Sequence, residues 1–131
     1  MNFEEKERDD GLGIWFIYDS LNNPEHYLQY IKPVLKRINY EKNYFEIYNC
    51  QVQNQIQYND CGLFALAFAI AICENIEPAQ LKFDQNSMRR HFNWTLNNPN
   101  SLIQFSNEIN YDFKPKYTKH IVDISNVFFK F

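Results

Sequence analysis

The sequence predicts an α+β domain, because segments typical of strands alternate with segments typical of helices. Two runs rich in aromatic and β-branched residues, 13–19 and 44–52, are expected to form strands of a small sheet. An apolar helix that begins at Cys61 is expected to pack on that sheet as the central buried element. The chain has 131 residues, of which 45% are hydrophobic and 18% aromatic, enough for one folded domain with its own core.

The first predicted strand is a nearly continuous apolar run after a Gly-Leu-Gly break, which is typical of a strand buried on both faces, and it ends at Asp19. A helix start follows at Asn22-Asn23-Pro24, with proline at the first helical position. The apolar residues of this helix recur at helical spacing: Tyr27, Leu28, Ile31, Val34, Leu35 and Ile38. Pro33 removes one of its hydrogen bonds and favours a kink.

The second predicted strand alternates in polarity and leads into a polar loop before Cys61. The helix from Cys61 to about Glu74 is apolar nearly all round, and residues 86–96 form a predicted amphipathic helix. Residues 1–12 form a charged segment that is not expected to be a strand. The main domain is therefore placed at 13–105. The tail, 106–131, either covers the core or is partly disordered.

Composition argues against several classes of function. The net charge is −3 and no block of Lys and Arg occurs, so no nucleic-acid partner is expected. No apolar run approaches the roughly 18 residues that cross a bilayer, and the charged start does not resemble a signal peptide. The three cysteines and three histidines show no metal-ligand spacing, so we expect reduced thiols, no metal, no cofactor and a location in the nucleus or cytoplasm. The oligomeric state is left open.

Cys61 is the candidate nucleophile. A cysteine at a helix N-terminus lies near the positive end of the helix dipole, which favours the reactive thiolate. Gln55, six residues earlier, and the backbone N–H groups of the first turn are candidate donors to an oxyanion. The alternative is that Cys61 is a buried structural residue and that Asp60 is an ordinary N-cap. Cys50 and Cys73 are both interpreted as core residues.

Three motifs in order resemble the ubiquitin-like-protein-specific cysteine proteases, the SUMO-protease and adenain-like group. They are Tyr18-Asp19-Ser20-Leu21, the segment from Val52 to Leu66 that contains Asp60-Cys61-Gly62, and Met88-Arg89-Arg90-His91-Phe92. The resemblance covers residues 13–105 and implies a partial papain-like or adenain-like fold.

The resemblance also implies a cysteine peptidase that cleaves peptide or isopeptide bonds after a ubiquitin-like modifier, as in desumoylation. Its partners would be the modifier or its conjugates. Cys61 would be the nucleophile, Gln55 would support the oxyanion, and Asp19 would orient a histidine. On the residues alone, Asp19 in Tyr-Asp-Ser is interpreted as a turn residue and Gln55 as an ordinary polar loop residue; only the resemblance favours the catalytic roles.

The catalytic histidine of that family is not found. It would lie in a His-Trp pair about seventeen residues before Asp19, where this chain has Asn2. His26, His91 and His120 are each interpreted as surface or half-buried residues. Two hypotheses follow: a truncated peptidase that lacks its histidine strand, or an inactive pseudoprotease that acts as a protein-binding module. Either form is expected to aggregate through the open edge of strand 13–19.

Overall fold

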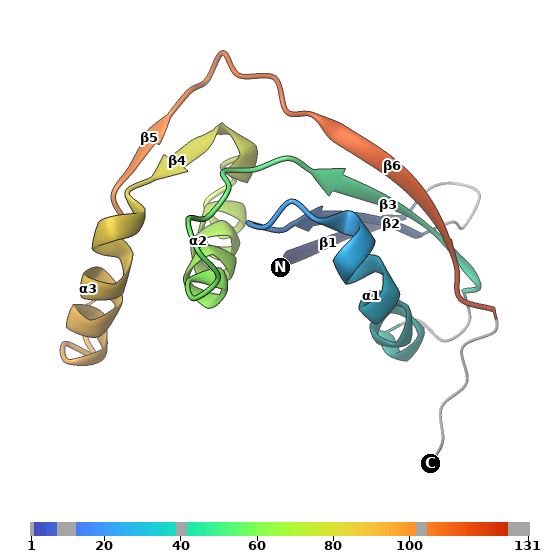
Figure 1. Cartoon of the computed structure of the whole chain (residues 1–131), viewed down its shortest axis with the longest axis horizontal. Coiled ribbons are helices and arrows are strands. Elements are labelled where there is room, and N and C mark those ends of the chain that lie inside the picture. Colours follow the sequence, from blue (N-terminus) through green and yellow to red (C-terminus); the bar gives the residue numbers. More distant parts are fainter. Residues whose placement is uncertain (1, 8–12, 39–41, 102–104, 126–131) are drawn as a thin grey trace.

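The computed structural model describes residues 2–7, 13–38, 42–101 and 105–125, and they form an α+β domain (Figure 1). Its core element is a four-stranded sheet in the order β1-β2-β3-β6. The strands are β1 (Asn2–Glu7), β2 (Gly13–Tyr18), β3 (Tyr44–Cys50) and β6 (Tyr117–Asp123). β2 and β3 are parallel, whereas β1 and β6 pair antiparallel with their neighbours at the two edges.

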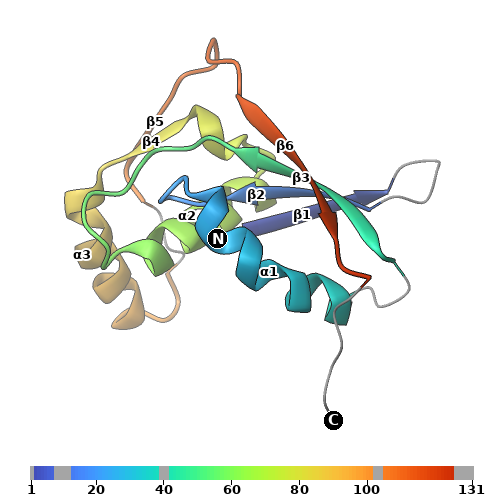
Figure 2. The ribbon, with the colours of Figure 1, turned by 45° about the vertical axis from the view of Figure 1, so that its right-hand side comes forward.

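The parallel strands need a crossover, which α1 (Pro24–Ile38) supplies along one face of the sheet (Figure 2). Odd-numbered residues of both strands face this helix and are buried with its apolar stripe. The buried cluster is Trp15, Ile17, Tyr27, Ile31, Leu35, Phe45, Ile47, Val122 and Ile124. The predicted helix is confirmed at Pro24 and Ile38, and it runs through Pro33 without a break.

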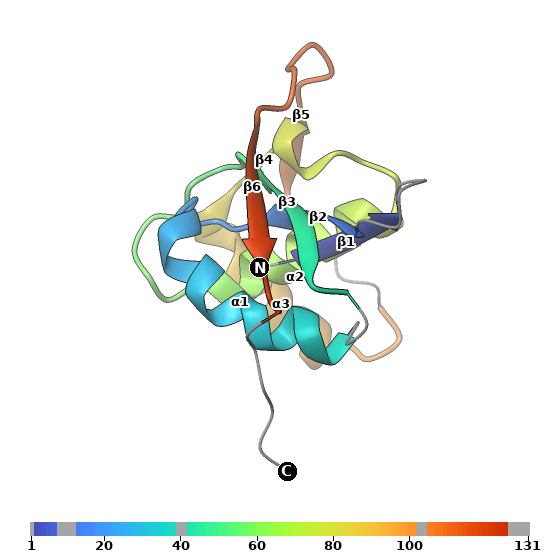
Figure 3. The same cartoon turned by 90° about the vertical axis from the view of Figure 1, so that its right-hand side faces the viewer.

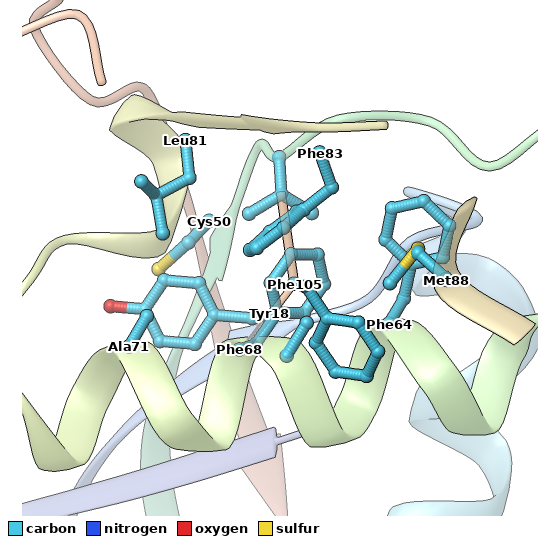
Figure 4. Close-up of a cluster of buried hydrophobic side chains, with 11 residues drawn as sticks. Tyr18, Cys50, Phe64, Phe68, Ala71, Leu81, Phe83, Met88 and Phe105 are labelled. Atoms are coloured by element: carbon cyan, nitrogen blue, oxygen red, sulfur yellow. The ribbon is translucent and has the colours of Figure 1, made fainter. Parts of the chain in front are cut away.

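The opposite face of the sheet, at the end where β2 and β3 finish, packs against α2 (Cys61–Cys73) (Figure 4). Phe64, Ala67, Phe68 and Ala71 form the buried stripe of this helix, and the Tyr18 ring lies 6.5 Å from the Phe68 ring. The helix is confirmed at its predicted start. It is buried on one stripe and half-buried or exposed elsewhere, so it is less enclosed than its all-round apolar sequence predicts.

Cys73 corrects a prediction about the thiols. Cys50 is fully buried as expected, but Cys73 is exposed because it lies on the last turn of α2, beyond the part that the sheet covers. The apolar sequence of α2 gives no sign of this, since every side chain in it reads as a core residue.

A smaller layer follows α2. The short 3₁₀ helix η1 (Pro78–Gln80) leads into β4 (Leu81–Phe83), and α3 (Gln85–Leu96) begins one residue before its predicted start. β5 (Asn107–Ile109) pairs antiparallel with β4 as a second, two-stranded sheet. Phe83 contributes to the core through ring contacts at 6.2 Å with Phe64 and 6.0 Å with Phe68.

The N-terminal segment overturns an expectation. β1 pairs antiparallel with the whole of β2, with Asn2 opposite Tyr18 and Glu7 opposite Gly13. Charged side chains do not prevent backbone pairing, and they are common on edge strands because they discourage association. The edge of β2 is therefore covered by β1. Aggregation through an open edge of β2 is no longer expected, because that edge is already paired.

The tail is part of the fold. β6 pairs with β3 over seven positions, from Tyr44 opposite Asp123 to Cys50 opposite Tyr117 (Figure 3). Val122 on β6 and Ile124 just beyond it are buried in the cluster beneath α1. Of the two alternatives left open for this region, coverage of the core holds for residues 117–124.

Two isoleucines in this tail test its contribution to stability. We expect Ile124→Ala to lower the free energy of unfolding by about 2–5 kcal/mol, because the side chain is fully buried. Ile121→Ala serves as the control, since this residue is 60% exposed and its loss is expected to change stability by less than about 0.5 kcal/mol. Urea unfolding of both variants measures the difference. Equal values would mean that β6 does not dock as described.

Candidate active site

Cys61 is the first residue of α2, as the sequence predicts. It is half-buried, and its thiol donates a hydrogen bond to the backbone carbonyl of Tyr58 at 3.4 Å. The polar segment 51–60 carries the chain from the end of β3 to this position. Much of that segment has no regular structure, so its backbone polar groups need partners from elsewhere in the fold.

Two side-chain amides supply such partners to the loop backbone, and a third, from the loop itself, does the same for the backbone of β4. Each one accepts a hydrogen bond from the backbone N–H of a single residue and donates one to the carbonyl of the same residue. The pairs are Asn22 with Val52, Gln53 with Phe83, and Gln85 with Ile56. Their donor–acceptor distances lie between 2.6 and 3.1 Å. These amide clamps join the loop to the turn after β2, to β4 and to α3.

Arg89 of α3 holds the two residues that precede Cys61. Its Nε donates to the Asp60 carboxylate at 2.7 Å, and its Nη2 donates to the Asn59 carbonyl at 2.8 Å. Gln85 donates to the other Asp60 oxygen at 2.9 Å. Asp60 is at the N-cap position but makes no cap hydrogen bond, and its backbone (φ −111°, ψ 14°) lies outside the extended region that capping needs.

The first turn of α2 therefore keeps its N–H groups uncapped. Within the described part of the chain, no acceptor meets the backbone N–H of Cys61, Gly62 or Leu63, and the first helical hydrogen bond is from Phe64 to the Asp60 carbonyl at 3.1 Å. These N–H groups belong to the first turn, whose donors have no carbonyl partner within the helix, and the side chain of Asp60, which could cap them, is held by Arg89 and Gln85 instead. These donors, next to a thiol, suit an oxyanion.

Gln55 is buried, and its hydrogen bonds hold it at the end of β2. Its Oε1 accepts from the Ser20 hydroxyl, its backbone N–H donates to the Ser20 carbonyl at 3.0 Å, and its Nε2 donates to the Gln57 carbonyl at 2.7 Å. No described hydrogen bond joins Gln55 to Cys61. The structure thus brings Gln55 to the Asp19 turn and leaves one of its two amide hydrogens without an assigned acceptor.

Asp19 follows β2 and organises a turn. Its carboxylate accepts hydrogen bonds from the backbone N–H of Leu21 at 3.1 Å and of Asn23 at 3.5 Å. The pKa of Tyr27 is raised, first by burial and then by the negative charge of Asp19. The turn interpretation of Asp19 is thus confirmed, and its carboxylate makes no described contact with Cys61.

None of the three histidines is bonded to Cys61 or Asp19 in the described ranges. His26 is exposed on α1, with its ring 5.4 Å from that of Tyr30, while His91 lies on α3 and His120 on β6, opposite Ile47. Position 2, where the expected histidine would fall, is occupied by Asn2, paired with Tyr18 at the end of β2. β1 also lies against α2.

Sequence reasoning found Cys61, Asp19 and Gln55 but missed the groups that hold them. In the sequence Arg89 is recognisable only as part of a motif, and no local pattern distinguishes the amides of Asn22, Gln53 and Gln85 from other polar residues. The only signal in the sequence is a weak one: a loop rich in Asn and Gln, without secondary structure, needs hydrogen-bond partners for its backbone. The sequence does not indicate which side-chain amides supply them.

Comparison with known protein families, curated proteins and solved structures found no match. In the described residues, no group of three or more His, Cys, Asp or Glu side chains could hold a metal ion. No helix in those ranges is long and apolar enough to cross a membrane.

Arg89 gives a direct test of this geometry. We expect Arg89→Ala to slow alkylation of Cys61 by iodoacetamide about threefold to tenfold, because the Asp60 carboxylate then loses its cation and repels the forming thiolate. The pair is worth at most about 1 kcal/mol at this exposure, so the domain stays folded. Peptide mapping by mass spectrometry measures the rate, with Cys73 as the internal reference.

Arg90→Ala is the matched control, since it removes the same charge from the next residue of α3, for which no hydrogen bond to the loop is described. An equal loss of Cys61 reactivity in both variants would show that only net charge matters. No change in Arg89→Ala would contradict the role assigned to this side chain.

Proposed function

We propose that this chain is a domain of the ubiquitin-like-protein-specific cysteine protease type, with a partial papain-like arrangement and Cys61 as its nucleophile. The observation that carries the proposal is the uncapped first turn of α2, which offers backbone donors beside a half-buried thiol. The motif resemblance adds the substrate class: peptide or isopeptide bonds that follow a ubiquitin-like modifier.

The chemistry divides into an attack and a proton transfer. The Cys61 sulfur bonds to the substrate carbonyl carbon, the electron pair of the C=O bond moves to oxygen, and the first-turn N–H groups stabilise that oxyanion. When the oxyanion collapses, the C–N bond breaks and the leaving nitrogen takes a proton, which leaves a thioester. Water later hydrolyses the thioester. The thiol proton and the proton for the leaving nitrogen both require an acid–base group.

Among the residues that the structure describes, no acid–base side chain is bonded to Cys61. A histidine in this role is typically worth about 10²–10⁴-fold in rate. Asp19 is committed to its turn, and a carboxylate beside a thiolate would oppose ionisation. Gln55 can add one N–H to the oxyanion but cannot transfer a proton. We therefore expect the chain as given not to hydrolyse such a substrate at an appreciable rate.

A second candidate, a binding module without peptidase activity, is favoured by the register of β1. The strand position expected for the histidine is filled within this chain, opposite Tyr18, but the residue there is Asn2. The carboxamide of asparagine does not titrate and cannot serve as a base. On this view the domain keeps the fold and binds the tail of a ubiquitin-like protein without cleaving it.

Position 2 allows a gain-of-function test. We expect Asn2→His to raise turnover of a ubiquitin-like protein carrying a C-terminal fluorogenic amide by about 10²-fold or more, because an imidazole would then be carried by β1 at the position paired with Tyr18, the residue before Asp19. Cys61→Ala in the same background should abolish the gain.

Glu4→His is the control, since position 4 lies on the same strand but pairs with Phe16, two residues further from Asp19. Turnover by the unmodified chain that depends on Cys61 would show that another base operates. No gain in Asn2→His, in a protein that still melts cooperatively, would contradict the proposed site.

A further inference from the structure

β6 forms one edge of the four-stranded sheet, and no strand of the described ranges pairs with its outer side (Figure 3). Two hydrogen bonds show which backbone groups face outward. The Ile124 N–H donates to the Asn43 carbonyl at 2.7 Å, and the Gln51 N–H donates to the Lys116 carbonyl at 3.0 Å. Because hydrogen-bonded pairs alternate with non-bonded pairs in an antiparallel ladder, the even-numbered residues of β6 bond to β3. The odd-numbered residues therefore direct their N–H and C=O groups to the open edge.

Three of these odd-numbered residues carry a self-complementary series of side chains: Lys119, Ile121 and Asp123. They lie on the sheet face away from α1, because Val122 between them is buried beneath that helix. All three are exposed, and Ile121 is 60% exposed. One exposed isoleucine is common on a protein surface. The inference rests on its place midway between a cation and an anion, on an edge whose backbone groups face outward.

We propose that two copies of this chain associate through β6, in an antiparallel pairing whose two-fold axis passes at Ile121, so that the two sheets become continuous. Ile121 then lies against Ile121 of the second copy. Lys119 lies opposite Asp123 of the second copy, once on each side of the axis. All these residues face the open edge, so each pair can form the two backbone hydrogen bonds of a bonded antiparallel pair.

The charges of this edge favour the pairing. Hydrogen bonds from Ser125, and to a smaller extent the charge of Lys32, lower the pKa of Asp123, so its carboxylate is ionised at neutral pH. The Lys119 ammonium lies 3.1 Å from the Glu46 carboxylate, and its three N–H donors can also bind a second carboxylate. A lysine on an edge strand usually discourages association. In this register, however, each lysine meets an aspartate.

The neighbouring register, with its axis at His120, also pairs outward-facing residues but is less favourable. Lys119 would lie opposite Ile121, and Asp123 would lie opposite Tyr117. Neither charge would then have its counterion directly opposite, where cross-strand pairs interact most strongly. The axis is therefore assigned to Ile121.

The other edge of the sheet makes the association a closed pair. β1 carries three glutamates and one lysine in six residues, and two copies of such a strand repel each other. A dimer through β6 therefore leaves only edges that do not pair with themselves. Because a two-fold contact uses the same surface of both copies, the assembly stops at two.

Sedimentation velocity over a range of protein concentrations tests the proposal. One strand pair is expected to bury less than the roughly 1,200 Å² of a stable complex, so we expect a weak dimer, present on the order of 100 µM and absent near 1 µM. Unfolding of Ile121→Ala at the lower concentration therefore reports on the monomer. A chain that stays monomeric at about 300 µM, or one that forms species larger than a dimer, overturns the proposal.

Ile121→Lys places two lysines at the axis and should weaken the dimer at least about tenfold. Within each copy the new lysine lies opposite Glu46, so the fold is retained, which thermal unfolding checks. Ile56→Lys makes the same change at a 71% exposed position of the loop before Cys61, and should alter dimer formation by less than about twofold. Equal losses in the two variants, or none in Ile121→Lys, would overturn the assignment to β6.

A charge exchange tests the register. Lys119→Asp and Asp123→Lys each place like charges opposite one another twice in the dimer, and each should weaken it about tenfold. The double variant restores opposite charges and should bring the Kd within about threefold of the original value. Glu46 keeps a lysine as diagonal neighbour in it, because positions 119 and 123 flank Ile121, which lies opposite Glu46. Single variants without effect, or a double variant weaker than both, would overturn this register.

Discussion

The position of Cys61 depends on how an irregular polar loop satisfies its backbone. Segment 51–60 cannot use a ladder of its own, and unpaired polar groups at a half-buried site would cost about 1–3 kcal/mol each. The three amide clamps, from Asn22, Gln53 and Gln85, solve this by giving single loop or strand residues both a donor and an acceptor. They join the loop to the turn after β2, to β4 and to α3, so three parts of the fold fix the segment that leads to Cys61.

Arg89 then determines what surrounds the thiol. It binds the Asn59 carbonyl and the carboxylate of Asp60, the side chain at the N-cap position that would otherwise cap the start of α2. A helix that forgoes its cap gives up about 1 kcal/mol of stability. The uncapped donors and the compensated Asp60 carboxylate both involve this one side chain of α3.

The sequence predicted the elements with strong periodicity and missed those without it. α1 and the start of α2 were predicted correctly because the proline at the first position of α1 and the apolar patterns of both helices are local signals. β1 and β6 were missed because edge strands pair through their backbones and carry charged or exposed side chains, which leave no clear alternation. In the site, Cys61 was found from its position, whereas the roles of Arg89 and of the amide clamps arise only from tertiary contacts.

Amide hydrogen exchange at the start of α2 tests the central claim, that Arg89 keeps the first turn uncapped. The account predicts that the N–H groups of Gly62 and Leu63 exchange at least about tenfold faster than that of Phe64, which donates to the Asp60 carbonyl at 3.1 Å. NMR of the unmodified chain resolves the three amides separately. If Gly62 and Leu63 are protected as strongly as Phe64, the first turn is capped and the proposed oxyanion donors are not available.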